Sequence, residues 1–501
     1  MDIEGGFRLA MRISKNSVFV VSYFEKSKMK FVDRIAEQEA LKEALASSCS
    51  EFIVLYGRRR LGKSTLIRRV LGDGDIYFEA SLSEKAIQLS LLARAIATEY
   101  PGFDKPVYSD WEDIIMAYNY RCKENATLVL DEFPYLVQKD PSLPSTLQKI
   151  LDLRVASVQK LRCNIIICGS SQRMMQGLLK GSEPLYGRAE NIFILRPVKL
   201  PWWKEVVNTS AKELVEEYSV WGGVPQYWSH REKYGSLSDA IQGLILDGMG
   251  NLYDEPSRLF LDEVSDIAPY SSIMLAVGSG KQKYSSISDA LGKTTAELAK
   301  PMKHLTEMFF LRKEVPFGEN PLKSKKILYR IEDPFMAFYY KFIEPNKSMI
   351  ALGRGNIAKK YIEDGFNGHV AEVWERLCQL AVTGSDVIEG HTWNVASRWW
   401  GKVPVFETGK KTPVGYEDLE FDVVAEDLYD KNTILVGECK WAASDYADRL
   451  LEKLKKKVSL APFAQGKNVV YVLFLREEPL PGPQNCKVML PEEVASLLKI
   501  D

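Results

Sequence analysis

The chain has 501 residues, which is more than one hydrophobic core usually organises, so about two to four domains are expected. Its hydrophobic content of 46% and charged content of 27% are those of an ordinary globular protein. The formal net charge of -1 excludes a uniformly basic nucleic-acid binder, although local basic patches have to be counted separately.

The seven cysteines are scattered and form no CxxC pair, a pattern that favours reduced thiols in a cytosolic protein over a disulfide framework or a zinc site. No apolar run approaches the length of a membrane span. The apolar stretch SVFVVSYF (17–24) lacks a small-residue cleavage site, so it predicts a strand or a short helix instead of a signal peptide. We therefore expect a cytoplasmic protein that has no membrane partner.

Residues 51–70, EFIVLYGRRRLGKSTLIRRV, predict a buried strand, a glycine-containing loop and a helix. In this order the loop backbone wraps phosphates, Lys63 reaches the β and γ phosphates, and Ser64 supplies a hydroxyl to Mg²⁺. A plain glycine turn is the alternative, but the order of strand, loop and helix argues against it. The expected ATP-binding residues are Gly57, Arg58, Arg59, Arg60, Leu61, Gly62, Lys63, Ser64 and Thr65.

A second apolar run, ATLVLDEF (126–133), ends in two carboxylates. Asp131 is expected to hold Mg²⁺ through water, and Glu132 to orient and deprotonate the attacking water. An acidic pair after a strand can instead cap a loop. The separation of about 70 residues from the nucleotide loop favours catalysis, because it leaves room for an additional strand between the two.

A third buried run, CNIIICGSS (163–171), ends in Ser170 and Ser171, where P-loop ATPases of the additional-strand class place a polar sensor of the γ-phosphate. Farther along, PLYGR (184–188) brings Arg188, which we expect to stabilise transition-state charge as an arginine finger does. The alternative for Arg188 is an ordinary surface residue in a loop.

At this point the sequence resembles the archaeal-type ATPases, a group within the signal-transduction ATPases with numerous domains. GRRRLGKS, VLDEF and the GSS to PLYGR series occur in the order of that group. FVDRIAE (31–37) resembles its N-terminal motif, with Arg34 and Glu37 matching and Asp33 and Ile35 departing from the usual Gly and Glu.

WGGVPQYW (221–228) is similar to the Gly-x-Pro motif of the same group. The resemblance implies that Gly223 and Pro225 lie near the adenine and sense the nucleotide. A helix-breaking turn within a helical lid is the alternative interpretation.

Residues 271–345 predict two helices followed by a β-hairpin, which together describe a winged helix-turn-helix. The family resemblance implies the same fold. The window 281–330 holds eleven Lys and Arg against five Asp and Glu, a net charge of +6 within a chain of net charge -1. Such a cluster suits DNA phosphates, whereas winged helices of this class often only pack against the nucleotide domain. The lysines concerned are Lys293, Lys300, Lys303, Lys323, Lys325 and Lys326.

The last 150 residues follow a polar stretch, ALGRGNIAKK (351–360), which we interpret as a linker. GHVAEVWERLCQLAV (368–382) predicts an amphipathic helix, and SRWWGK, LEFDVVAED, TILVGECKW and NVVYVLFL predict three or four strands.

Side chains two apart in a strand face the same way, so Glu438 and Lys440 share a face. A turn around LYDKN would place Asp422 beside Glu438, where two carboxylates bind Mg²⁺ and Lys440 stabilises the pentavalent phosphate or positions water. Glu375 on the preceding helix would complete the metal shell, with Glu372 as the alternative. Solvated charges at a sheet edge are the plainer interpretation, but these lie inside a hydrophobic run.

This order of helix Glu, then Asp, then Glu-x-Lys resembles the PD-(D/E)xK nuclease fold, and WERLC, RWW, EFDVVA and GECKW match its pattern. The archaeal-type ATPases often carry such a C-terminal domain.

The expected fold class is α/β: a P-loop ATPase core with a parallel sheet (1–200), a helical lid (201–270), a winged helix (271–348) and a restriction-endonuclease-like domain (349–501). With ATP and Mg²⁺ as cofactors, the leading hypothesis is an ATPase that regulates a nuclease-like module acting on DNA. The alternative is a nucleotide-gated docking switch with an inactive C-terminal domain, and an oligomer is compatible with either. A helicase-like motor is disfavoured, because a second ATPase lobe is missing from the sequence.

Overall fold

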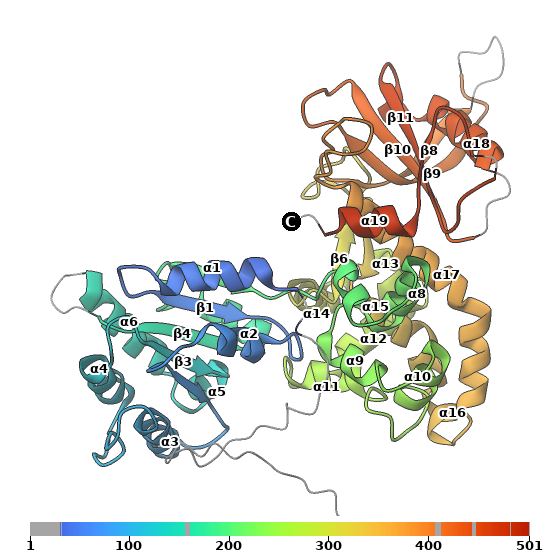
Figure 1. Cartoon of the computed structure of the whole chain (residues 1–501). Coiled ribbons are helices and arrows are strands. Elements are labelled where there is room, and N and C mark those ends of the chain that lie inside the picture. The colour runs from blue at the N-terminus through green and yellow to red at the C-terminus, as the bar shows by residue number, and fades with distance from the viewer. Residues whose placement is uncertain are drawn as a thin grey trace, which may run out of the picture.

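The computed structural model describes residues 31, 33–155, 161–405, 412–442, 447–480 and 482–499 of the chain. The strand or helix expected at 17–24 lies outside the described residues. Figure 1 shows the N-terminal sheet and its helices at the left, a helical region beside them, and a second sheet stacked on the helical region. None of the described helices is both long and apolar enough to cross a membrane.

The N-terminal sheet has five parallel strands in the order β2-β3-β4-β1-β5. Every residue of β1, β3 and β4 is buried, because continuous apolar runs are what a sheet covered on both faces requires. β4 lies between β1 and β3, and the strand for which the chain separation leaves room is present as β2 at the edge of the sheet. The bounds are β1 Phe52–Tyr56, β2 Ile76–Glu79, β3 Thr127–Asp131, β4 Asn164–Gly169 and β5 Asn191–Ile194.

Helices cover both faces of this sheet and separate its core into two clusters. Leu41, Leu66 and Ile67 pack under one face, and a larger cluster that includes Trp111 and Tyr118 fills the other. The helices are α1 Ile35–Leu45, α2 Lys63–Val70, α3 Lys85–Ala97, α4 Trp111–Arg121, α5 Phe133–Lys139, α6 Leu143–Val155 and α7 Gln172–Leu178. Loops after parallel strands meet at one edge, so the segments after β1, β3 and β4 converge there.

A helical region follows, in which capping boxes start two helices, Ser210 with Glu213 for α8 and Thr294 with Glu297 for α14. The two helices and the hairpin expected within 271–345 are present as α13, α14 and the antiparallel pair β6 and β7. The bounds are η2 Leu200–Glu205, α8 Ala211–Trp221, α9 Pro225–Arg231, α10 Leu237–Leu244, α11 Glu255–Leu261, α12 Ala268–Gly278, α13 Tyr284–Leu291, α14 Thr295–Glu307, β6 Leu311–Glu314, β7 Leu328–Ile331, α15 Pro334–Phe338, η3 Tyr339–Ile343, η4 Glu344–Asn346, α16 Lys347–Ala351 and α17 Gly355–Val382.

The linker expected at 351–360 is wrong, because α17 begins within it and runs on for 28 residues. One hydrophobic cluster continues from the helical region through α17 into the second sheet, and it includes Trp221, Phe338, Trp374 and Phe474. The two regions therefore share a core, and a helix joins them where a flexible segment was expected.

The second sheet has the order β12-β11-β10-β9-β8. β8, β9 and β10 are antiparallel neighbours, whereas β11 and β12 continue the sheet in parallel. Its α18 connects β10 to β11, and α17 and α19 contact the sheet region as well. The bounds are β8 Ser397–Val405, β9 Gly415–Glu426, β10 Thr433–Lys440, α18 Ala447–Leu460, η5 Pro462–Ala464, β11 Asn468–Leu475, β12 Lys487–Met489 and α19 Pro491–Leu497.

A buried histidine joins α17 to α8. His369 is 1% exposed, its Nε2 donates to the carbonyl oxygen of Ser219 at 2.7 Å, and the rings of Phe338 and Phe342 contact it edge-on. Burial lowers the pKa of His369 from 6.5 to about 4.

This histidine makes folding sensitive to acid. The unfolded chain takes up a proton near pH 6.5 and the folded chain does so only near pH 4, so stability is full above that window and falls within it. At pH 5 the loss is about 2 kcal/mol. In His369→Gln, which keeps an N–H donor without a charge, the decrease in unfolding free energy from pH 7 to pH 5 should be smaller by about that amount. Urea unfolding measures this; equal decreases in both proteins would contradict it.

Candidate functional site

The loop after β1 holds the predicted phosphate-binding residues at the edge where the strands end. Gly62 has a φ of 85°, a left-handed conformation that glycine adopts without strain, and Lys63 begins α2 directly after it. Lys63 is 6% exposed and its Nζ donates to the carbonyl oxygen of Arg58 at 3.2 Å. Thr65, two positions after Lys63 in the helix, is exposed.

Asp131 lies at the sheet edge where these strands end and is 2% exposed. The Ser64 hydroxyl donates to Asp131 Oδ2 at 2.8 Å, and the Tyr77 hydroxyl donates to the same oxygen. Burial, to which the Asp131 charge adds, raises the pKa of Tyr77. Sequence reasoning missed Tyr77, which is the second residue of the strand that neighbours β3.

Glu132 follows Asp131 with a φ of 51°, which turns its side chain toward the next strand. Its Oε2 accepts from the Ser170 hydroxyl at 2.7 Å and from the Ser170 backbone N–H at 3.2 Å. Ser171 instead begins α7 and donates to Glu263 at 3.0 Å. Of the two serines proposed as sensors, the structure thus brings Ser170 to the carboxylate expected to activate water.

These groups fit a nucleotide triphosphate with Mg²⁺. A serine hydroxyl paired with a buried carboxylate supplies the oxygen ligands that Mg²⁺ prefers, and the helix N-terminus beside Lys63 favours negative charge. Bound Mg²⁺ would supply positive charge to the β and γ phosphates.

The three consecutive arginines of this loop form ion pairs with carboxylates of the helical region. Arg58 is 6% exposed and pairs with Asp333 at 2.7 Å, and the Asp333 charge holds the pKa of Arg58 above its usual value against the effect of burial. Arg60 pairs with the fully buried Glu255, and Arg59 pairs with Asp262 at 3.0 Å. No local sequence signal marks these acidic partners, since they lie far along the chain.

The expected adenine region joins three segments. Arg34 donates to the carbonyl oxygens of Leu61, at 3.5 Å, and of Arg196, and Leu61 packs into the core of the helical region. The Val198 N–H donates to the Gly223 carbonyl oxygen at 2.8 Å, and a Cβ at Gly223 would collide with the Val198 backbone. Glycine is therefore required there by close backbone contact.

Pro225 and Arg188 are the other two predicted residues of this part of the chain. Pro225 is the first residue of α9, where a proline costs the helix no hydrogen bond. Arg188 forms ion pairs with Asp152 on α6, 2.9 Å from Nε to Oδ1, and this pairing raises the pKa of Arg188.

A second set of predicted residues meets where the pairing of β9 with β10 ends. The paired register of these strands ends at Gly437 and Val423, one residue before Glu438 and Asp422. Lys440 Nζ lies 2.7 Å from Glu438 Oε1, and the Cys439 N–H donates to Asp422 Oδ2 at 2.8 Å. The geometric expectation that Asp422, Glu438 and Lys440 come together therefore describes the structure.

Cationic side chains accompany each of these carboxylates. Lys457 on α18 lies 2.8 Å from Glu438, and Arg398 on β8 lies 2.6 Å from Glu375. Sequence reasoning missed both cations, although RWW contains Arg398. The alternative helix residue, Glu372, is turned toward Lys341 at 2.9 Å.

The carboxylates influence one another's pKa electrostatically. Burial, to which the charge of Asp422 adds, raises the pKa of Glu375 to about 7, and burial with the charge of Glu438 raises the pKa of Asp422. Burial also acts on Glu438, but Lys440 and Lys457 outweigh it and lower the pKa of that carboxyl. The three acidic groups are therefore close enough to repel, which is the situation that a divalent cation relieves.

Within the described ranges, no three or more His, Cys, Asp or Glu side chains are gathered so as to hold one metal ion. Carboxylate oxygens are the ligands that Mg²⁺ prefers, so the donor chemistry of Glu375, Asp422 and Glu438 fits it. In this structure, Arg398, Lys440 and Lys457 neutralise those donors instead.

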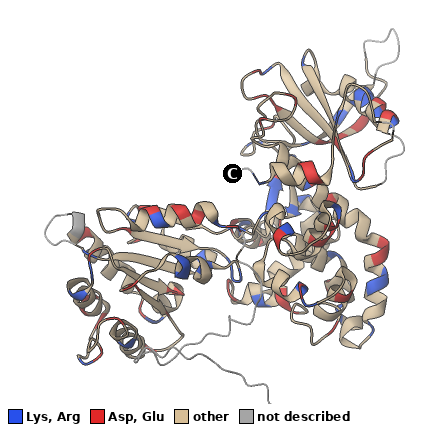
Figure 2. Cartoon of the chain, in the orientation of Figure 1, with Lys and Arg blue, Asp and Glu red and all other residues tan. Residues whose placement is uncertain are grey.

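The basic residues of the helical region lie mainly around its hairpin. Figure 2 shows Lys and Arg on the hairpin strands and along α18. Three of the predicted lysines form ion pairs at the surface, Lys293 with Glu297, Lys303 with Glu307 and Lys326 with Glu319. The segment after β6 does not project freely: the Phe317 ring packs on Phe463, 5.8 Å between centroids.

Comparison with known proteins identifies two regions. Residues 31–229 match the model of an ATPase domain found predominantly in Archaea, and residues 339–455 match a family described as archaeal and bacterial proteins of unknown function. An uncharacterised protein of Methanocaldococcus jannaschii is 29% identical over 437 residues, covering 85% of this chain and 90% of its own. The chain thus carries an ATPase domain at its N-terminal side and a C-terminal domain of a family without known function.

Two solved structures are similar at low identity. The Walker-type ATPase of Pyrococcus abyssi is 19% identical with a TM-score of 0.45, covering 62% of this chain and 95% of its own. The ORC2 protein of Aeropyrum pernix, in ADPNP and ADP complexes, is 16% identical with a TM-score of 0.40, covering 64% and 95%.

Separating nucleotide binding from hydrolysis tests the first site. Lys63→Ala removes the buried ammonium and should weaken ATP binding at least tenfold, whereas Glu132→Gln should bind ATP normally and lose about 100-fold in hydrolysis rate. Equilibrium binding of a fluorescent ATP analogue and phosphate release measure the two effects. Lys42→Ala, on the exposed side of α1, is the control. Unchanged binding in Lys63→Ala would remove the nucleotide site.

Breaking the Arg58 to Asp333 pair tests the contact between loop and helical region. Asp333→Asn keeps the oxygen that caps α15 and leaves Arg58 buried without its charge partner, which should cost about 3 kcal/mol of unfolding free energy. The matched control is Asp254→Asn, whose partner Lys347 is partly exposed, with an expected cost below about 1 kcal/mol. Urea unfolding followed by tryptophan fluorescence measures both; equal costs would contradict the prediction.

Proposed function

We propose that this protein is an ATP-driven regulator in which the nucleotide state of the ATPase domain controls a winged-helix and nuclease-like module that acts on DNA. The observation that carries the proposal is the meeting of Asp422, Glu438 and Lys440 where the pairing of two neighbouring strands ends. The proposed division is 1–200 for the ATPase core, 201–270 for a lid, 271–348 for a winged helix and 349–501 for the nuclease-like domain.

In the ATPase domain, Lys63 would hold the β and γ phosphates, and Ser64 and Asp131 would hold Mg²⁺. Glu132 would orient the attacking water and take its proton, and its contact with Ser170 supports a role for that hydroxyl as the sensor of the γ-phosphate. Arg188 faces Asp152 in its own chain, so a role as an arginine finger would be directed at the site of a neighbouring copy. Assembly into an oligomer would then complete the catalytic site.

The topology of the C-terminal domain supports a nuclease-like fold. A helix carrying Glu375 precedes three antiparallel strands, and a helix then leads to a parallel strand, as the PD-(D/E)xK resemblance implies. Asp422 and Glu438 would bind a divalent cation, Glu375 would complete its ligands, and Lys440 would stabilise charge on the attacked phosphate. One cation supplies the charge that activates water beside a phosphodiester.

DNA is the proposed partner because the basic residues lie beside the carboxylate site. α18 exposes Lys453, Lys455 and Lys456, and Lys457 on the same helix contacts Glu438 directly. The hairpin adds Lys323 and its neighbours, so a phosphate backbone would meet positive charge on both sides of the carboxylates.

A docking switch is the second candidate, and a specific observation favours it. Glu375 and Glu438 are both engaged by cationic side chains, and the segment after β6 packs Phe317 against the C-terminal sheet. A domain whose carboxylates are permanently paired with cationic side chains would serve as a docking platform. ATP would then control the assembly of that platform.

Plasmid nicking with Mg²⁺ and ATP separates the two candidates. Asp422→Asn and Glu438→Gln should each lower nicking at least 100-fold, because each removes one negative ligand of the cation. The control is Glu426→Gln on the same strand as Asp422, where the side chain contacts Lys467 instead, and nicking there should persist. Absence of nicking in every protein, together with an ATP-dependent change of mass, would favour the docking switch.

A further inference from the structure

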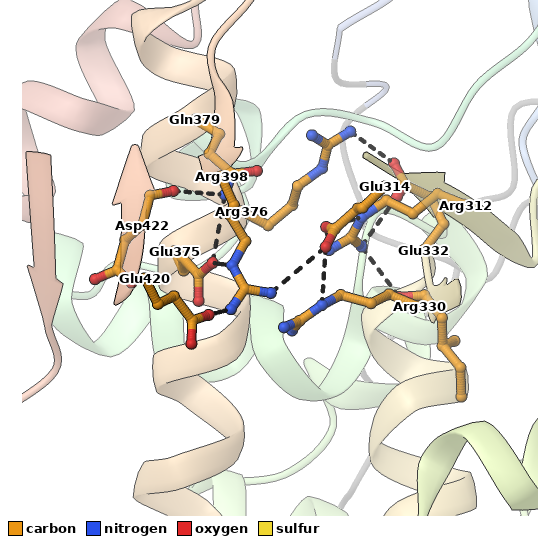
Figure 3. Close-up of polar contacts among 11 residues, drawn as sticks. Arg312, Glu314, Arg330, Glu332, Glu375, Arg376, Gln379, Arg398, Glu420 and Asp422 are labelled. Atoms are coloured by element: carbon orange, nitrogen blue, oxygen red, sulfur yellow. Dashed lines mark hydrogen bonds and ion pairs between the residues drawn. The ribbon is translucent and has the colours of Figure 1, made fainter. Parts of the chain in front are cut away.

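One carboxylate on the hairpin is shared by three guanidinium groups. Glu314 ends β6, and it lies 2.7 Å from Arg312, 3.0 Å from Arg330 and 3.5 Å from Arg398. All four side chains are largely buried, with exposures between 9% and 17%. Figure 3 shows this cluster between the hairpin strands and the C-terminal sheet.

Arg398 reaches from this cluster to the proposed metal ligands. It belongs to β8, and besides Glu314 it contacts Glu375 at 2.6 Å and the half-exposed Glu420. Its backbone is held as well, because the Phe317 N–H donates to the Arg398 carbonyl oxygen at 2.8 Å. One guanidinium therefore connects the hairpin of the helical region to the carboxylate site of the C-terminal domain.

The connections of Arg398 are ionic and poorly aligned. Its Nε and Nη1, and Oε2 of Glu314, are buried without a hydrogen bond of acceptable geometry. A buried network in which only some hydrogen bonds are formed loses few of them when one side chain moves. Such a network can therefore exist in more than one arrangement. Because Glu375 is buried near Asp422, its negative charge needs a nearby cation, and Arg398 provides it here.

We propose that Arg398 is a positioning residue that occupies Glu375 in competition with a divalent cation, and that Glu314 on the hairpin draws Arg398 away from Glu375. The guanidinium stands where the charge of the cation would act, so the position of the hairpin sets how available the carboxylate is. This inference rests on the proposed function, since it assigns the regulation of that same site.

Mn²⁺ binding to the full chain, followed by electron paramagnetic resonance at pH 8 without nucleotide, tests the proposal. All proteins carry Asp131→Asn, so that Mn²⁺ at the nucleotide loop is not counted. Arg398→Gln should tighten Mn²⁺ binding at least fivefold, because the competing charge is gone. Glu314→Gln should weaken binding by a similar factor, because Arg398 then stays on Glu375.

These opposite signs distinguish positioning from a merely structural role, which would shift both variants in one direction. Arg398→Lys retains a charge without the fork that spans Glu314 and Glu375, so it should give an intermediate affinity and serves if Arg398→Gln fails to fold. Affinities unchanged or lowered in both Arg398 variants would overturn the inference. Asp422→Asn reports on the proposed function separately: Mn²⁺ affinity that does not depend on Asp422 would remove the carboxylate site itself.

Discussion

Burial of charge between the ATPase domain and the helical region is the constraint on which the architecture depends. Arg58 and Asp333 are both almost fully buried, and Arg60 meets a Glu255 with no exposed surface. Such pairs add little net stability compared with apolar packing, but leaving one partner alone is costly. Their effect is therefore to specify one position of the phosphate loop relative to the helices, and movement of either side must carry the other with it.

Two adjacent residues connect this constraint to the far end of the molecule. Asp333 pairs with Arg58 of the phosphate loop, while Glu332 accepts from Arg312 at 3.2 Å and lies 3.4 Å from Arg376 on α17. Arg312 in turn contacts Glu314, the hairpin carboxylate that also faces Arg398. A series of charged side chains, partly exposed at Glu332 and Arg376, thus runs from the loop before Lys63 to the helix that carries Glu375. The series offers a physical route for coupling.

The sequence predicted what short-range patterns determine. A continuous apolar run predicts a buried strand, a glycine after it predicts the phosphate loop, and period-two spacing placed Glu438 and Lys440 on one face. It did not predict Tyr77, Lys457 or Arg398, because their roles come from neighbours far away in the chain. The linker was wrong for a related reason: the polar, glycine-containing start of α17 has weak helix propensity, and packing in the shared core makes it helical.

Charge balance explains why the C-terminal site is found neutralised. The charge of Asp422 raises the pKa of Glu375 and the charge of Glu438 raises that of Asp422, so the three carboxyls cannot all remain ionised in a buried place without cations nearby. Side chains supply that charge here, and Arg398 differs from Lys440 and Lys457 in one respect: it alone of these three also contacts the hairpin. Any cation or nucleic acid that entered this site would have to displace or rearrange these groups. Displacement of Arg398 from the carboxylate site would also change its contact with the hairpin of the helical region, because the same guanidinium makes both contacts.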